Sequence, residues 1–363
     1  MTDVDVSAEV EGLPILYQHW LQSILPGGMP RERVATCLDC AMCARTPEEQ
    51  QTMIGAHNPD TKCCTYFPNV PNYLVGRAID VDTPGARVML GYVESGTSSE
   101  ANVTLHGVAP TGKRSGLYDL IGSTGGFGRD PDLLCPYAIE VGTREGPLCG
   151  IWEHRNSVCS TYFCKHVNGG SGRHLWMAIR NLFRHIESSL SWWAIAQLVP
   201  EPGPLLLRPP TQQEERIDSA LSPEAWNYWS GTRADFYRAC SEKVEALSWE
   251  EVVSVVGFKA ALYVEEVCAN YDHVYGDTFP DPLRPTAFTM IRAGHDRTTL
   301  QGRGGGGSEH VVVPTTLLRL LPYFDGRPTQ DVLSDIKSQE GVGLDVALVR
   351  KLYDFGILER ADV

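Results

Sequence analysis

The sequence predicts an α+β protein with an irregular cysteine-rich metal-binding domain containing short strands, a helical domain and a small winged-helix-like C-terminal domain. Nine of the eleven cysteines precede residue 165, apolar residues recur at helical spacing beyond residue 173, and the last 55 residues form a self-contained apolar pattern. With 363 residues the chain is long enough for several domains, and its apolar content of 42 % is enough to form buried cores. We place the domain boundaries at residues 1–170, 171–276, 277–308 and 309–363.

The cysteine-rich domain opens with a predicted helix over residues 14–25, which ends at Pro-Gly-Gly. Residues 77–130 are rich in Gly, Thr and Ser, and the runs RVMLGYV and ANVTLHGV within them predict an irregular sheet with loops. The glycine-rich stretch GSTGGFGRD at 122–130 lacks the Lys-Ser/Thr ending of a phosphate-binding loop. We therefore interpret it as a loop that could pack near the cysteines.

The helical domain is predicted as one long helix over residues 173–199, followed by helices at about 211–221, 223–245 and 248–275. Gly257 is a possible break in the last of them. Residues 277–308 are proline-rich and then glycine-rich, which is typical of a linker or mobile loop, and GGGGS at 304–308 is also a common engineered linker. The C-terminal domain should hold a short strand, a helix, a DGRPT turn with Thr329 as N-cap of the next helix, and a final helix ending at Gly356.

Charge and hydropathy narrow the choice of partners. A formal charge of −14 and a pI near 5.2, with no strong basic patch, argue against nucleic acid and against anionic membranes. The sequence has no run of eighteen apolar residues that could span a membrane. The acidic N-terminus lacks the pattern of an export signal, so we expect a cytoplasmic protein.

Clustered thiols in a reducing compartment are more often metal-binding or redox-active than disulfide-forming. Cys240 and Cys268 lie among apolar residues at helical spacing and are interpreted as ordinary buried cysteines. The other nine are the candidate metal ligands: Cys37, Cys40, Cys43, Cys63, Cys64, Cys135, Cys149, Cys159 and Cys164.

The spacing within this set favours iron–sulfur chemistry. Two successive C-x2-C steps, from Cys37 to Cys43, are what a ferredoxin-type loop uses, with a distant Cys-Pro as fourth ligand. Cys135 precedes a proline, so we predict that it completes the first centre. The second centre would use four of the remaining five cysteines. Two four-thiolate centres use eight of the nine, and four-cysteine zinc sites are the structural alternative.

Three histidines lie close enough to these cysteines to be considered as ligands or proton donors. His57 falls between Cys43 and Cys63 and could complete a site of three cysteines and one histidine. His154 and His166 lie beside the last cysteines, where a surface or supporting position is the simpler interpretation.

The string CGIWEHRNSVC at 149–159, with Ile151, Trp152 and Arg155 between its cysteines, resembles the YkgJ-like cysteine-cluster family, which chelates zinc or iron. The LCPY segment and the vicinal pair at 63–64 are similar to further cysteines of that family. Nineteen residues separate Cys43 from this pair, whereas the family has a compact arrangement. The family includes the flagellin lysine N-methylases, so the resemblance implies one or two bound [4Fe-4S] clusters over residues 37–165.

The C-terminal segments VVVP, LLRLLPYFDGRPT and LYDFGIL look like the winged-helix domains of PQQ-peptide chaperones, which implies a peptide or protein partner. Taken together, the sequence favours a cytosolic iron–sulfur protein acting as a redox or cluster-dependent enzyme. The alternatives are a zinc-stapled module that binds a peptide or protein, and a peptide- or protein-modifying enzyme such as a methylase.

Overall fold

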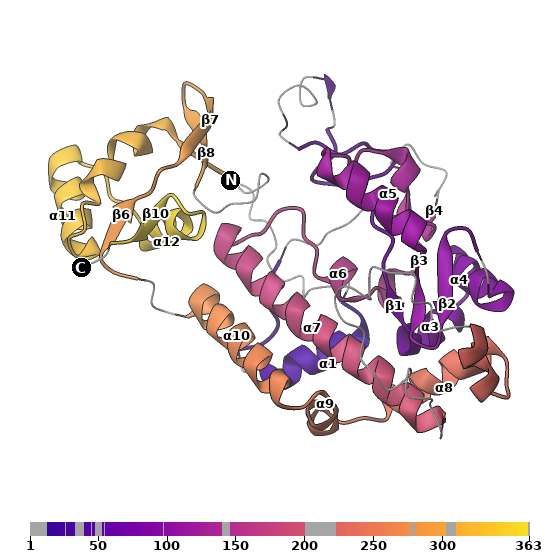
Figure 1. Cartoon of the computed structure of the whole chain (residues 1–363). Coiled ribbons are helices and arrows are strands. Elements are labelled where there is room, and N and C mark those ends of the chain that lie inside the picture. The colour runs from indigo at the N-terminus through magenta and orange to yellow at the C-terminus, as the bar shows by residue number, and fades with distance from the viewer. Residues whose placement is uncertain are drawn as a thin grey trace.

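The computed structural model describes residues 13–25, 27–32, 40–44, 46–47, 53, 55–96, 98–139, 146–199, 223–276, 280–302 and 310–361. Within these ranges, helices dominate and small antiparallel sheets are interspersed, which confirms the predicted α+β class. Figure 1 shows the long helix α7 near the middle of the molecule, with the C-terminal part of the chain at one end of it.

The central helix α7 (Gly169–Leu198) confirms the long helix predicted from periodicity. Its buried side chains include Leu175, Ile179 and Phe183, and they recur every three or four residues along one stripe. Helix α1 (Ile15–Ile24) lies against this stripe, where the Tyr17 ring stacks on Phe183 with 4.6 Å between centroids. Helix α10 (Phe258–Tyr275) also packs on α7 (Figure 1).

Two helices and a three-stranded sheet stand beside α7. Strands β1 (Val70–Pro71), β2 (Ala101–Thr104) and β3 (Gly107–Pro110) pair antiparallel in the order β1-β3-β2, and Val103 faces Val108. Helix α3 (Asn72–Ile79) packs on α8 (Arg233–Glu245), and α5 (Gly112–Ser123) follows the sheet. The predicted β-like character of ANVTLHGV is therefore confirmed as a hairpin.

The expected strand RVMLGYV is wrong, because these residues belong to helix α4 (Pro84–Ser95). Thr83 caps its first turn by accepting from the Ala86 N–H, and Pro84 occupies the first helical position. Gly96 closes the helix in the left-handed conformation. These three local signals outweigh the β-propensity of the valines and the tyrosine.

Short elements connect this region to α7. They are β4 (Ala138–Ile139), β5 (Leu148–Cys149), α6 (Ser157–Ser160) and single 3-10 turns at Pro131–Leu133 and Trp152–His154. Strands β4 and β5 pair antiparallel with Ala138 opposite Cys149. The irregular cysteine-rich region expected from the sequence is thus built from loops around very short strands.

The remaining helices agree with the sequence in part. Residues 211–221 lie outside the described residues, and the helix predicted at 223–245 is divided into a 3-10 turn (Pro223–Tyr228) and α8. Helix α9 (Trp249–Val256) ends at Gly257, where α10 begins, which confirms the predicted break. Cys240 is fully buried in the core as expected, and Cys268 is partly buried.

The C-terminal unit has its own apolar core and begins earlier than predicted. Strands β6 (Leu283–Pro285), β7 (Thr289–Ala293) and β8 (Arg297–Gln301) lie in the stretch interpreted as a linker, so that interpretation is wrong for these residues. The proline-rich and glycine-rich composition obscured short apolar positions in this stretch, such as Leu283 and Leu300, which are buried. The glycine run at 304–308 lies outside the described residues.

The rest of the unit follows the predicted order more closely. Strand β9 (Val311–Pro314) completes a sheet of order β7-β8-β9, and 3-10 turns follow at Thr315–Arg319 and Leu321–Tyr323. Helices α11 (Thr329–Glu340) and α12 (Val346–Asp354) lead to β10 (Leu358–Arg360), which pairs with β6. Thr329 is the first residue of α11 rather than its N-cap, and its hydroxyl donates to the Asp281 carboxylate at 2.6 Å.

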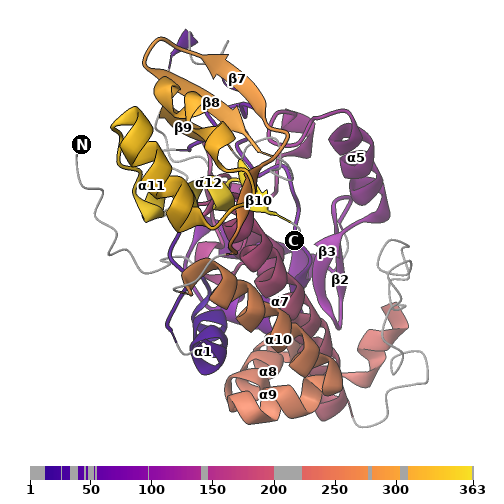
Figure 2. The ribbon, with the colours of Figure 1, turned by 90° about the vertical axis from the view of Figure 1, so that its left-hand side faces the viewer.

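The C-terminal unit packs on the helices through α12, which contacts α7. Figure 2, turned by 90°, shows the unit above the ends of α7 and α10. Helix α7 starts five residues after Cys164, so this contact lies close in sequence to the last candidate ligand.

Candidate metal centre

Eight of the nine candidate ligands are described, and Cys37 lies outside the described residues. All ten described cysteines are free thiols. Four of them contact one another and are named here the first thiol group: Cys40, Cys43, Cys63 and Cys164. A second thiol group contains three further cysteines near one another: Cys135, Cys149 and Cys159.

The four thiols of the first group form a chain of sulfur–sulfur hydrogen bonds from Cys43 through Cys40 and Cys164 to Cys63, and the Cys63 thiol also contacts that of Cys64. Hydrogen bonds from the Cys164 and Cys43 thiols lower the pKa of Cys40, and those from Cys164 and Cys64 lower the pKa of Cys63. The same contacts raise the pKa of Cys43 and of Cys164, which act as the donors. Cys40 and Cys63 are therefore the acceptors in this chain, the position in which a thiolate is favoured.

Local backbone bonds bring these residues together. The Cys43 N–H donates to the Cys40 carbonyl at 3.0 Å, which closes a tight turn. The carbonyl of Met42 in that turn accepts from the His57 N–H at 2.7 Å, so the next segment is attached to it. A C-x2-C spacing thus gives two sulfurs on one turn, and the pair at 63–64 arrives on the segment that follows His57.

The second thiol group lies deeper. Cys135 follows a 3-10 turn, Cys149 ends β5, and Cys159 lies on α6, whose N-cap Asn156 accepts from the Cys159 N–H at 3.0 Å. Burial raises the pKa of Cys135 to about 12 and also raises the pKa of Cys149 and of Cys159. These thiols remain protonated at neutral pH as long as no metal ion binds them.

Cys64 connects the two groups. Its thiol hydrogen-bonds Cys63 of the first group, and its carbonyl accepts from the Cys135 N–H of the second at 2.7 Å. The charge on Cys63 also acts on the pKa of Cys149 and of Cys159. Cys64 is therefore joined to the first group by its thiol and to the second by its backbone.

Each thiol group has one buried cation beside it. Lys62 is only 2 % exposed and has a positive φ of 51°, and its charge opposes the rise in the pKa of Cys43 that the Cys40 hydrogen bond and burial cause. The Arg155 guanidinium lies over the Trp152 ring at 3.5 Å and donates to the Cys159 carbonyl at 3.2 Å. Its charge acts to lower the pKa of Cys159, although burial has the larger and opposite effect. A buried cation offsets the charge of sulfur anions. Lys62 was missed from the sequence, although it directly precedes Cys63.

The predicted division of the cysteines between two centres stays a prediction, and the contacts among the described thiols favour a different division. Cys135 was expected to join Cys40 and Cys43, but the distant thiol in contact with Cys40 is that of Cys164. Cys135 instead has Cys149 as its thiol neighbour. The reason is the chain path: Cys135 is attached by its backbone to Cys64, on the far side of the vicinal pair.

Two buried carboxylates hold the cysteine-bearing loops on the helices. Glu187 of α7 accepts from the Ser157 N–H and hydroxyl, both at 2.6 Å, and from the Tyr17 hydroxyl. Glu32 accepts from the Val167 N–H at 2.9 Å, just beyond Cys164. Burial raises the pKa of Glu187. No pattern in the sequence singles out these two residues, because their partners lie far away along the chain.

The three histidines differ in their surroundings. His57 is 5 % exposed, its Nδ1 has no hydrogen-bond partner among the described residues, and its side chain hydrogen-bonds Cys40. His154 lies on a 3-10 turn, where burial lowers its pKa. The ring of His166 is edge-on to Phe163 at 6.1 Å. Only His57 is thus in contact with the first thiol group through an interaction described for these residues.

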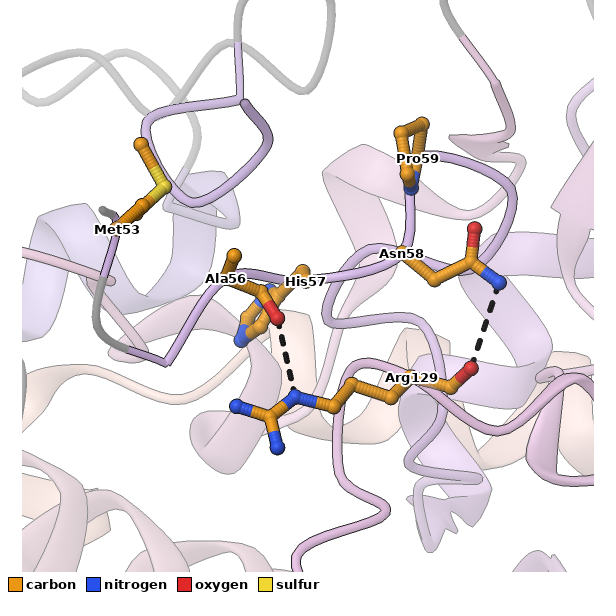
Figure 3. A pocket seen from close by; sticks show the side chains of 6 residues that line it. All are labelled: Met53, Ala56, His57, Asn58, Pro59 and Arg129. Carbon is orange, nitrogen blue, oxygen red and sulfur yellow. Dashed lines mark hydrogen bonds between the residues drawn. The ribbon is translucent and has the colours of Figure 1, made fainter. Parts of the chain in front are cut away.

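A pocket of about 450 Å³ opens next to His57. Figure 3 shows its lining residues: Met53, Ala56, His57, Asn58, Pro59 and Arg129. The Arg129 Nε donates to the Ala56 carbonyl at 3.0 Å, which fixes the guanidinium at the rim of the pocket (Figure 3). Small molecules could therefore approach the first thiol group from this side.

Within the described ranges, no three His, Cys, Asp or Glu side chains are arranged as ready-made ligands of one metal ion. The sulfurs contact one another in a chain, so binding a metal would require them to move apart around it. In the same part of the chain, no helix is long and apolar enough to cross a membrane. Comparisons with protein-family models, curated proteins and solved structures found no match, so the likeness to the YkgJ-like family stays a prediction.

Proposed function

We propose that this chain is a cytosolic iron–sulfur protein whose two thiol groups hold [4Fe-4S] clusters and serve a redox or cluster-dependent enzyme reaction. The observation that carries the proposal is the first thiol group. Four free thiols from three separate segments contact one another, and two of them have lowered pKa values. Thiolates are the form in which cysteine binds metals.

The donor set fits two centres. Cys40, Cys43, Cys63 and Cys164 would hold the first, and Cys64 would join Cys135, Cys149 and Cys159 at the second. A [4Fe-4S] cluster takes four cysteine thiolates, and it supplies one-electron transfer or, with an open iron position, substrate activation. The buried cations Lys62 and Arg155 support the proposal because they offset the charge that the thiolates would carry.

Zinc fits the same donor set, since structural zinc sites also use four cysteines. Elemental analysis of the purified protein distinguishes the two metals. Protein purified without oxygen should contain iron and sulfide in equal amounts and absorb broadly near about 400 nm. Zinc without iron would select the structural alternative, and protein with neither metal would contradict the proposal.

A pair of variants connects the metal to the first thiol group. Cys164→Ala should lose metal, because it removes the sulfur between Cys40 and Cys63. Cys268→Ala is the matched control, since that partly buried thiol lies on α10 and donates weakly to the Ile24 carbonyl at 3.6 Å. Equal metal content in both variants would show that Cys164 is not a ligand.

A peptide or protein partner for the C-terminal unit is a second proposal, compatible with a peptide-modifying enzyme such as a methylase. It rests on strand β7, which pairs only with β8 among the described strands and has mostly exposed side chains. An extended peptide can add to such an edge through main-chain hydrogen bonds. Ile291 has no partner in the β7–β8 register, so Ile291→Pro would interrupt this edge with little damage to the pairing.

The measurement is selection of extended peptides from a displayed library against the whole protein. Peptides that bind β7 should lose binding to the Ile291→Pro variant. Equal binding to both proteins would contradict this edge as the docking site.

A further inference from the structure

His57 has an unusual environment for a buried histidine. It is 5 % exposed, and Nδ1 has no hydrogen-bond partner in the described part of the chain. A buried polar atom without a partner is destabilising. The side chain contacts the thiol of Cys40, and its charge, when protonated, acts on Cys63. The ring thus lies at the edge of the first thiol group, with its Nδ1 unpartnered among the described residues.

The surrounding chain fixes this ring closely. The His57 N–H donates to the Met42 carbonyl at 2.7 Å, inside the Cys40–Cys43 turn. Phe127 meets the ring edge-on with 5.7 Å between centroids. Gly128, at φ +73°, lies so near that a Cβ there would be 2.4 Å from His57 Cδ2. The imidazole therefore has little freedom to turn toward solvent.

The nearby threonine hydroxyl groups form hydrogen bonds with backbone atoms and not with the His57 ring. The Thr65 hydroxyl accepts from the Gly128 N–H at 2.8 Å, and the Thr61 hydroxyl donates to the Gly128 carbonyl at 3.0 Å. These bonds hold Gly128 against the imidazole, but they provide no hydrogen-bond partner for His57 Nδ1. A rigid, buried imidazole with an unused nitrogen beside thiolates is the arrangement of a metal ligand.

We propose that His57 is a ligand of the first centre, so that this centre has mixed imidazole and thiolate coordination. The inference rests on the proposed function, because it requires a metal at these thiols. With His57, the described residues offer five donors for the first centre, one more than four-coordinate binding needs. One thiol of the group would then be left to act as a hydrogen-bond donor or in reaction with a substrate.

Mixed coordination has a chemical consequence. A neutral imidazole in place of an anionic thiolate raises the reduction potential of an iron–sulfur centre, as histidine ligation does in Rieske centres. The pocket of about 450 Å³ has His57 in its lining, so the histidine side of the centre is the side that a small molecule can reach.

The test is pulsed EPR on the reduced whole protein, prepared with natural-abundance and with ¹⁵N-labelled histidine. A hyperfine coupling that changes with the nitrogen isotope supports the ligand, and it should vanish in His57→Ala but persist in His154→Ala. His57→Cys should keep the metal, lack the coupling and have a lower midpoint potential.

The outcomes separate the two proposals. Wild-type protein that contains iron and sulfide but shows no histidine nitrogen coupling would overturn the histidine ligand alone. Protein without any metal would overturn the proposed function as well. If the metal is zinc, the probe is Co²⁺ loaded into the metal-free protein, whose d–d bands should move to longer wavelength in His57→Ala; unchanged bands would contradict the histidine ligand.

Discussion

At the scale of single residues, the two thiol groups differ in ionisation. Cys40 and Cys63 have pKa values lowered mainly by hydrogen bonds from neighbouring thiols, whereas burial raises that of Cys135 to about 12. A lower pKa places more of a cysteine in the nucleophilic thiolate form at a given pH. We therefore expect Cys40 and Cys63 to be the more reactive thiols in the absence of metal.

The first prediction concerns labelling of metal-free protein. Iodoacetamide at about pH 6–7 should modify Cys40 and Cys63 before Cys135 and Cys159, because the pKa is lowered for the first two thiols and raised for the other two. Peptide mass spectrometry at increasing times gives the order. Cys268, which is partly buried and has a raised pKa, is the internal reference for a slow thiol. Earlier labelling of Cys135 than of Cys40 would contradict the assignment.

The second prediction compares two glycines in one loop. Gly128→Ala should destabilise the protein and weaken metal retention, because it combines a positive φ of 73° with a Cβ 2.4 Å from the His57 ring. Gly125→Ala has a similar φ of 82°, but its Cβ would meet only Arg129 Nη1 at 3.8 Å. Gly125→Ala should lower the free energy of unfolding by about 1 kcal/mol through backbone strain alone. Gly128→Ala should lower it by clearly more.

Urea unfolding and metal analysis of both variants check this comparison. If the two alanine variants had equal stability and equal metal content, Gly128 would not be needed to accommodate the His57 ring.

At the scale of elements, Glu187 joins three helices. It lies on α7 and accepts hydrogen bonds from Tyr17 of α1 and from Ser157 at the start of α6. Burial raises its pKa even though these bonds oppose the rise. The segment that includes Cys159 is therefore attached to the core through a carboxyl group that binds its proton more tightly in the folded protein than in the unfolded chain.

The third prediction follows from this linkage. Because the folded state holds the extra proton, the stability contributed by Glu187 is full below the unfolded pKa of about 4.3 and declines as the pH rises toward the raised folded value. The decline is at most about 1.4 kcal/mol per pH unit. Glu187→Gln cannot ionise, so the difference in free energy of unfolding between wild type and variant should shrink over this range and then level off.

Urea unfolding of both metal-free proteins between about pH 4 and 8 measures this difference. The control is Glu245→Gln, which removes a partly exposed carboxylate paired with Arg77 at 2.9 Å. If the stability difference between wild type and Glu187→Gln stayed constant with pH, the carboxyl group would titrate normally.

The elements that the sequence could predict are those specified locally. Helix α7 follows from one apolar stripe, and the break at Gly257 from a single glycine with φ +76° between two helices. Helix α4 was mistaken for a strand because its caps outweigh its β-branched residues. The strands over 283–301 were mistaken for a linker because prolines and glycines in the same stretch dominated its composition.

The sequence could predict which cysteines are candidate ligands. It could not predict how they divide between the two thiol groups. Spacing identifies Cys40 and Cys43 as one turn, and the structure has them so. Which distant thiol joins them depends on tertiary contacts: the Cys-Pro rule predicts Cys135, whereas the distant thiol in contact with Cys40 is that of Cys164. His57 was visible as a histidine between two cysteine clusters, but its burial and unpartnered nitrogen require the folded chain.

At the scale of the whole molecule, the C-terminal unit is attached to the helices by α12. Arg350 donates to the carbonyls of His273, Val274 and Gly276 at the C-terminal end of α10. It also pairs with Asp354 at 3.2 Å, in a pair whose side chains are 16 % and 6 % exposed. A cation at the end of a helix satisfies its last carbonyls and favours its dipole.

The fourth prediction is that Arg350→Met loosens this contact without unfolding either part. The substitution leaves Asp354 buried without its cation, which should weaken the interface by about 3 kcal/mol. Hydrogen exchange should quicken in α12 and in the first turn of α7, while α11 stays protected. Arg284→Met is the control, since its exposed pair with Glu359 at 3.0 Å contributes about 0–1 kcal/mol. If both variants exchanged alike, Arg350 would not be what holds the C-terminal unit beside the segment that follows Cys164.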